Sequence, residues 1–135
     1  MEYLLDTNIV SYLLQGAASN KLKNKLMLTH PDSVFISQIT HAEIIYGLEK
    51  GGNIPQHIER VNSLLETLNI LDWDERCVPT YAKIRNELRL QGIAVQSMDL
   101  LIGSHALAHN LTLISNDHIF EHFKQFNLMV ENWQS

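Results

Sequence analysis

Apolar residues occur along the chain in short blocks separated by longer segments of mixed polarity. Five largely apolar runs of three or four residues stand out: Tyr3–Leu5, Val34–Ile36, Asn69–Leu71, Leu111–Ile114 and Leu128–Val130. Strands covered on both faces of a parallel sheet have this continuous pattern, whereas half-exposed strands alternate between apolar and polar residues. The runs therefore predict a mainly parallel sheet of about five short strands.

The segments between these runs have the residue spacing of helices. Helices are predicted over residues 7–15, 20–29, 38–50, 55–68, 79–91 and 98–109, with a short helix after Asp117. Pro55 and Pro79 suit the first turn of a helix, and Gly51 and Gly92 suit helix ends. This alternation of strands and helices predicts one doubly wound α/β domain over residues 1–135.

Composition narrows the class of protein. With 135 residues, of which 45% are hydrophobic and 19% charged, the chain is typical of a folded globular domain rather than a disordered one. The single cysteine, Cys77, cannot form an intrachain disulfide and argues against a zinc site built on thiolates. Neither a signal peptide nor a membrane helix is predicted, so we expect a cytoplasmic protein without a membrane partner.

Four acidic residues lie at the expected ends of strands or in the first turns of helices. Asp6 directly follows the first apolar run, and Asp117 comes shortly after the fourth. Glu43 lies one to two turns into the helix after the second run, and Asp99 begins a strongly apolar helix. Ligands of open parallel sheets bind beyond the carboxyl ends of the strands. All four side chains can therefore face the same edge of the sheet.

Each of these acids alone has an ordinary structural interpretation. An aspartate often caps a helix, and a glutamate within a helix is often solvated. Four carboxylates brought together would repel one another unless a hard divalent cation lay between them. A ligand set made only of oxygens favours Mg²⁺ or Mn²⁺ over Zn²⁺, and such ions support the hydrolysis of phosphodiesters. The pattern predicts metal-assisted phosphodiester hydrolysis.

Several short segments also carry a resemblance to a known family. They are Leu4–Asn8, Ala42–Gly47, Asp99–Ile102, Leu113–Asp117 and, near the end of the chain, Val130–Trp133. In this order and spacing, and at this chain length, they resemble the PIN-domain ribonucleases, most of all the VapC toxins of bacterial toxin–antitoxin pairs. The resemblance implies a three-layer α/β/α fold around a central, mainly parallel sheet.

The resemblance implies roles for individual residues. The family's acidic quartet matches Asp6, Glu43, Asp99 and Asp117. In the family this quartet holds Mg²⁺ or Mn²⁺ and directs a water molecule at an RNA phosphodiester bond. The match implies direct metal contacts from the three aspartates and a water-mediated contact from Glu43. Ser115 matches a hydrogen-bonding helper of the site, and Thr7 and Asn8 match a polar pair that shapes the start of a helix.

The resemblance further implies a substrate and partners. VapC toxins cut RNA, many of them tRNA, and the sequence is similar to the group that cuts the anticodon stem-loop of initiator tRNA. Such a protein inhibits translation. A cognate VapB-type antitoxin would neutralise it by inserting a segment into the site. A homodimer and a toxin–antitoxin hetero-oligomer are expected.

Basic residues and histidines are further candidates for RNA contacts and for metal ligands. Arg85 and Arg89 share a helix face upstream of Asp99, and Lys50 lies seven residues after Glu43 on the same face. These three residues are predicted to contact RNA phosphates. The histidine pairs 105/109 and 118/122 have the i, i+4 spacing of metal ligands. Because no third zinc ligand is evident, they are interpreted as surface or packing residues.

Two alternative functions remain open at this point. A catalytically silent PIN-like module would bind RNA or protein without cutting it. A phospho-acceptor receiver domain would need an acidic pair after the first strand, where only Asp6 is available. The net charge of −5 argues at first against a nucleic-acid partner. Removing the four clustered acids from the fifteen leaves eleven against ten basic residues, so the acidity is concentrated at the predicted site.

Overall fold

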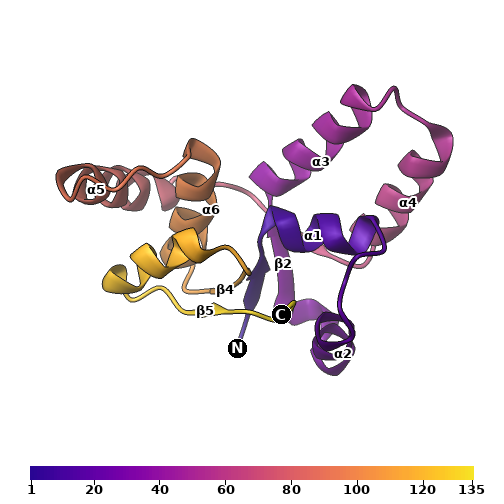
Figure 1. Ribbon diagram of the computed structural model, residues 1–135, viewed down its shortest axis with the longest axis horizontal. Coiled ribbons are helices and arrows are strands. Elements are labelled where there is room, and N and C mark those ends of the chain that lie inside the picture. The colour runs from indigo at the N-terminus through magenta and orange to yellow at the C-terminus, as the bar shows by residue number, and fades with distance from the viewer.

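The computed structural model describes residues 1–135 and is built around five parallel strands (Figure 1). They are β1 (Tyr3–Leu5), β2 (Val34–Ser37), β3 (Asn69–Leu71), β4 (Thr112–Ile114) and β5 (Val130–Glu131). Their order across the sheet is β3-β2-β1-β4-β5, and every neighbouring pair is parallel. The predicted sheet is confirmed. Its last strand begins two residues later than expected, because only Val130 and Glu131 pair with β4.

Helices cover both faces of the sheet, which confirms the three-layer α/β/α fold. They are α1 (Thr7–Leu14), α2 (Asn20–Leu28), α3 (Gln38–Lys50), α4 (Pro55–Leu65), α5 (Cys77–Leu90) and α6 (Ser97–Ala108), with the 3-10 helices η1 (Pro31–Ser33) and η2 (His118–Phe126). Helix α5 begins two residues before the predicted start, because Pro79 occupies a first-turn position whose missing N–H would have no partner within the helix. None of the helices combines the length and the apolar character needed to cross a bilayer.

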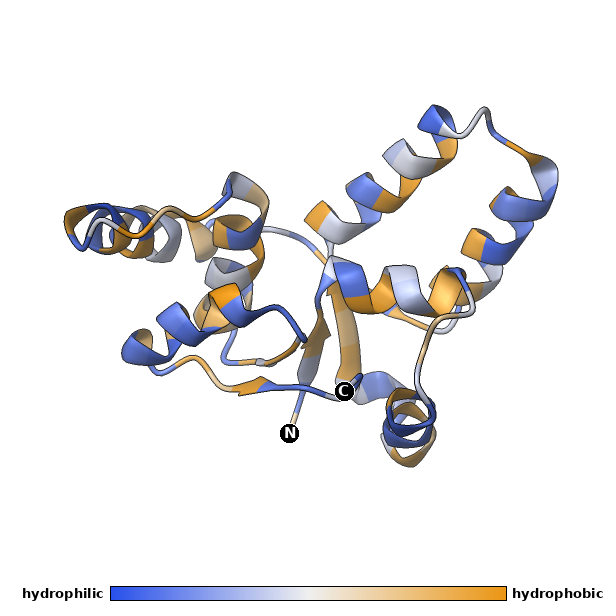
Figure 2. Ribbon diagram, in the orientation of Figure 1, coloured by the Kyte–Doolittle hydropathy of each residue, from blue (hydrophilic) through white to orange (hydrophobic).

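Side chains alternate between two hydrophobic cores, one on each face of the sheet. Leu4 and Leu113 are buried with residues of α5, α6 and η2. Their neighbours Leu5 and Ile114 are buried with residues of α1 to α4. This arrangement explains the continuously apolar runs, since successive side chains of a strand point to opposite faces. Figure 2 shows the corresponding division of the helices into hydrophobic and hydrophilic sides.

The strand order creates an open position at the carboxyl ends of β1 and β4. From β1 the chain proceeds to β2 and β3 on one side, and it returns to β4 and β5 on the other. Ligands of open α/β sheets bind where the order reverses in this way. Receiver domains have the order 2-1-3-4-5. The observed order differs from it, so the receiver alternative is wrong.

Packing of α6 against η2 leads to a test of the core. A Cβ atom added at Gly103 in α6 would overlap the ring of Phe123, which is fully buried. We expect Gly103→Ala to lower the free energy of unfolding by about 1–3 kcal/mol, as overpacking does. The matched control is Gly47→Ala in α3, where the added carbon meets nothing within 4 Å. Urea denaturation should show the control unchanged or more stable by about 0.5–1 kcal/mol. Equal effects at both positions would contradict the packing.

Candidate active site

Asp6 is held rigidly at the carboxyl end of β1. Its backbone N–H donates to the carbonyl oxygen of Ile114 over 2.9 Å, which continues the pairing of β1 with β4 by one residue. The side chain caps α1, because Oδ1 accepts from the backbone N–H of Thr7 at 2.8 Å. Oδ2 accepts from the hydroxyl of Ser115 at 2.9 Å. The carboxyl group is only 4% exposed, so both of its oxygens have defined positions.

Ser115 connects Asp6 to the loop that carries Asp117. Its Oγ donates to Asp6 and accepts from the backbone N–H of Asp117 at 3.0 Å. Asp117 in turn caps η2, where its Oδ1 accepts from the backbone N–H of Ile119 at 3.0 Å. Ser115 is 3% exposed. This buried hydroxyl therefore fixes the two aspartates relative to each other.

Asp99, in the first turn of α6, completes a group of three aspartates that influence one another. Burial raises the pKa of Asp6 to about 6, the bonds from Ser115 and Thr7 oppose that rise, and the charges of Asp99 and Asp117 add to it. The pKa of Asp99 is raised by burial and by the charge of Asp117. The three carboxyl groups therefore share one electrostatic environment at the edge of the sheet.

The carboxylate oxygens of the three aspartates, and the repulsion between their negative charges, fit a hard divalent cation. Like charges that share a buried site raise one another's pKa, and a cation between them removes that penalty. No three of the carboxylate groups have oxygens within 4.8 Å of one another. Mg²⁺ commonly binds through one or two carboxylates and keeps several of its waters, so it does not need a closed shell of protein ligands. The three aspartates could hold Mg²⁺ or Mn²⁺ in that way.

Glu43 borders this group from α3. The hydroxyls of Thr7 and Thr40 are 2.9 Å apart and join the first turns of α1 and α3. Glu43 follows Thr40 by three residues, so it lies on the same face of the helix. It is half-buried and shares a groove with Thr7. The charges that raise the pKa of Asp6 are those of the other two aspartates, and Glu43 is not among them.

The groove that contains Thr7 and Glu43 runs between α1, α3 and α4. Its apolar lining comes from Leu14, Ile44, Tyr46, Leu48 and Val61. Tyr46 is 59% exposed, so an aromatic ring stands open to solvent beside the acidic residues. The site thus has an acidic part at the sheet edge and an adjoining, mostly apolar groove.

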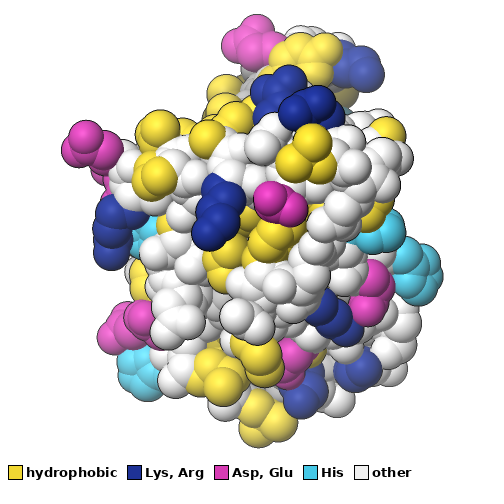
Figure 3. Space-filling view, turned by 90° about the vertical axis from the view of Figure 1, so that its left-hand side faces the viewer, with side chains coloured by type: hydrophobic (Ala, Val, Ile, Leu, Met, Phe, Trp, Pro, Cys, Tyr) yellow, Lys and Arg dark blue, Asp and Glu magenta, His cyan; other side chains and the backbone are white.

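The remaining predicted site residues lie outside the aspartate group. Asn8 is exposed in the first turn of α1, and Lys50 is exposed at the last position of α3. Arg85 and Arg89 are exposed on α5 and donate to Tyr81 and Asn86 of their own helix. Figure 1 shows α3 and α5 on opposite sides of the strands. On the α5 side, basic and acidic side chains are interspersed rather than gathered in one basic patch (Figure 3).

Two residues, Thr40 and Tyr12, support the site through contacts that the sequence does not reveal. Thr40 is fully buried and connects α1 to α3. Tyr12 accepts a hydrogen bond of 3.0 Å from the side chain of Asn116, which ties the loop after β4 to α1. In the sequence, Thr40 stands out only as a polar residue that has apolar neighbours and lies three positions before Glu43. Nothing local distinguished Tyr12, because its partner lies 104 residues away.

Asp6 makes the stability of the metal-free protein depend on pH. The pKa of Asp6 is raised from 3.8 to about 6. Protonation of its carboxyl group therefore stabilises the folded state relative to the unfolded state, and this stabilisation is complete below pH 4. It is lost as the pH rises through 6. Asp6→Asn removes this loss, so in EDTA the variant should be more stable than the original chain at pH 7.5, by about 3 kcal/mol.

The difference between the two proteins should shrink toward zero near pH 4 in urea denaturation. Asp32→Asn, at a side chain that is 88% exposed, serves as the control and should show no such difference. A constant difference between pH 4 and pH 7.5 would contradict the electrostatic description of Asp6.

Comparisons with known proteins identify the family of the chain. The PIN domain family model matches residues 3–125. Ribonuclease VapC2 of Rickettsia felis is 36% identical over 134 residues, covering 98% of each chain. The tRNA(fMet)-specific endonuclease VapC of Shigella flexneri is 26% identical over 133 residues, again covering 98% of each chain. The crystal structure of VapBC2 from Rickettsia felis bound to a promoter DNA fragment matches with a TM-score of 0.87 and 35% identity, over 98% of this chain and 99% of that one. The chain therefore belongs to the PIN domain family and, within it, to the VapC ribonucleases.

Proposed function

We propose that this protein is a divalent-metal-dependent endoribonuclease and acts as the toxin of a toxin–antitoxin pair. The observation that carries the proposal is the meeting of three aspartates at the carboxyl ends of β1 and β4, with Ser115 bonded to two of them. This position is the ligand-binding crevice of an open parallel sheet. The membership of the chain in the VapC ribonucleases supports the same reaction.

The residues of the site divide between metal binding and positioning. Asp6, Asp99 and Asp117 would hold Mg²⁺ or Mn²⁺, and Glu43 would contact it through water. When bound, such an ion makes a water molecule more acidic and neutralises charge on a phosphate. Ser115 and the N–H of Thr7 keep both oxygens of Asp6 in place. Glu43, at the border of the group, would accept a hydrogen bond from the attacking water and orient it toward the phosphorus.

The proposed substrate is tRNA, and initiator tRNA is the first one to test. The Shigella flexneri relative is a tRNA(fMet)-specific endonuclease, and the sequence motifs resemble that group. Lys50 and the pair Arg85 and Arg89 project from α3 and α5, on either side of the strands. Contacts from such residues to phosphates would orient an RNA without reading its sequence. Cleavage of initiator tRNA would stop translation.

A VapB-type antitoxin is the proposed partner. The related VapC2 of Rickettsia felis was solved as part of a VapBC2 complex. The groove between α1, α3 and α4 offers apolar side chains next to the acidic edge. A partner segment with an apolar face and one basic residue would fill the groove and pair with the carboxylates. Such a segment would block both the metal and the RNA.

Removing one aspartate should abolish cleavage without unfolding the protein. Asp99 is half-buried in the first turn of α6, and its carboxylate lies in the field of the other two aspartates. We expect Asp99→Asn to slow cleavage of labelled initiator tRNA in Mg²⁺ by about 100-fold or more, the size of effect seen when an electrostatic catalytic group is lost. EDTA should stop cleavage by the original chain.

Two matched controls make this test specific. Asp72→Asn, at an exposed position after β3, should leave the rate unchanged. On α3, Glu43→Gln should slow cleavage, whereas Glu49→Gln at an exposed position of the same helix should not. Cleavage that survives Asp99→Asn or EDTA would contradict the proposed site. A folded chain that cuts no RNA would favour the silent binding module.

A further inference from the structure

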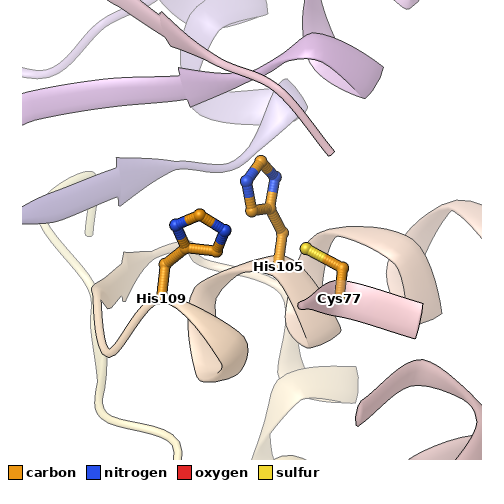
Figure 4. Close-up of side chains that lie close together, drawn as sticks. All are labelled: Cys77, His105 and His109. Atoms are coloured by element: carbon orange, nitrogen blue, oxygen red, sulfur yellow. The ribbon is translucent and has the colours of Figure 1, made fainter. Parts of the chain in front are cut away.

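A second group of metal-ligating side chains lies between α5 and α6. Cys77 is the first residue of α5, and His105 and His109 lie one turn apart near the end of α6. One ligand atom from each residue lies within 4.8 Å of the other two. Figure 4 shows the ring of His105 between that of His109 and the sulfur of Cys77. Cys77 and His105 have no exposed surface, and the side chain of His109 is 10% exposed.

His105 has a buried nitrogen without a hydrogen-bond partner. Its Nδ1 lies 2.8 Å from the hydroxyl of Ser37, whereas its Nε2 makes no hydrogen bond of ordinary geometry, although the backbone carbonyl of Asp72 also acts on the ring. Leaving a buried polar atom unpaired is costly. Burial also lowers the pKa of His105 to about 4, so the ring is neutral at pH 7. With the proton on Nδ1 bonded to Ser37, Nε2 keeps a lone pair inside the cluster.

Asp74 borders this cluster on the side of His109 and Cys77. Its Oδ1 lies 2.9 Å from Nε2 of His109 and accepts from the thiol of Cys77 at 3.6 Å. The guanidinium of Arg76, which can only donate, lies 3.0 Å from Nδ1 of His109. The proton of His109 is therefore on Nε2 and points at Asp74. In the metal-free protein, a thiol proton and an imidazole proton both point at one carboxylate oxygen.

We propose that Cys77, His105, His109 and Asp74 bind one Zn²⁺ ion, which ties the start of α5 to the end of α6. One sulfur, two imidazole nitrogens and a carboxylate oxygen form a donor set typical of tetrahedral zinc. Ligands of tetrahedral zinc stand about 3.5 Å apart. The atoms of Cys77, His105 and His109 lie within 4.8 Å of one another, and side-chain rotation would have to close the remaining distance and bring in Asp74. Binding would release the thiol proton, and the proton of His109 would move from Nε2 to Nδ1 while the exposed guanidinium of Arg76 turns away from that nitrogen. The thiolate and the carboxylate then balance the two charges of the ion.

This site differs from the aspartate site in position and in chemistry. His105 follows Asp99 by six residues in α6, which is about 9 Å along the helix axis and on another side of it. Its donors are softer than the oxygens that suit Mg²⁺. The expectation that the histidine pair lacks a third zinc ligand is wrong, because Cys77 is within reach. A single thiolate is enough for a mixed site of this kind.

Cobalt binding tests the proposal, because Co²⁺ replaces Zn²⁺ in tetrahedral sites and reports a bound thiolate by its charge-transfer absorption. The untagged, metal-free full chain should bind one equivalent of Co²⁺ with this band, and Zn²⁺ should abolish it. Cys77→Ser should remove the band. His109→Gln should weaken Zn²⁺ binding about 100-fold or more, and Asp74→Asn about 10- to 100-fold.

Two control variants separate this site from other histidines and from the aspartate edge. His118→Gln, at an exposed position of η2, and Asp99→Asn should both retain the band and the affinity. Circular dichroism checks that each variant is folded, and His109→Gln decides the outcome if Cys77→Ser fails to fold. The absence of the band in the folded original chain would overturn the proposal. So would Zn²⁺ affinity that is unchanged in His109→Gln, or that is lost only in Asp99→Asn.

Discussion

The parallel pairing of β1 with β4 is the constraint on which the candidate active site depends. The ladder aligns Leu5 with Ile114, and the N–H of Asp6 continues it by bonding to the carbonyl of Ile114. Asp6 and Ser115 are therefore neighbours as soon as the two strands pair, although they are 109 residues apart in the chain. A shift of one residue in this register would reverse the faces of the strand side chains and separate the two groups.

Burial of Asp6 illustrates a conflict between stability and function. A carboxylate that is 4% exposed and close to two others is unfavourable in the absence of a cation, as its raised pKa indicates. Three hydrogen bonds hold the group in place nevertheless: Asp6 accepts from Ser115 and from the N–H of Thr7, and Ser115 accepts from the N–H of Asp117. The fold thus holds an unfavourable charge that a bound cation would relieve. The negative net charge of the chain reflects this local concentration of acids.

The features that could be predicted from the sequence are those encoded locally. Apolar runs mark strands because both of their faces are buried, and an aspartate directly after such a run must lie at the edge of the sheet. The position of Asp6 follows from that rule, and that of Asp117 from the loop after β4, whereas Asp99 is predicted from its place in the first turn of a strongly apolar helix. The position of Glu43 relative to these aspartates depends on how α3 packs, through a contact between Thr7 and Thr40. The cluster of Cys77 with His105 could not be predicted, because it arises only when α5 and α6 pack together.

Anomalous diffraction from crystals soaked in Mn²⁺ tests the central claim most directly. If the carboxyl ends of β1 and β4 form a hard-cation site, the anomalous difference map will contain a peak bounded by the carboxylates of Asp6, Asp99 and Asp117. The same map for Asp6→Asn crystals will lack that peak. Density for Mn²⁺ elsewhere, with none between these three aspartates in the original chain, would contradict the account.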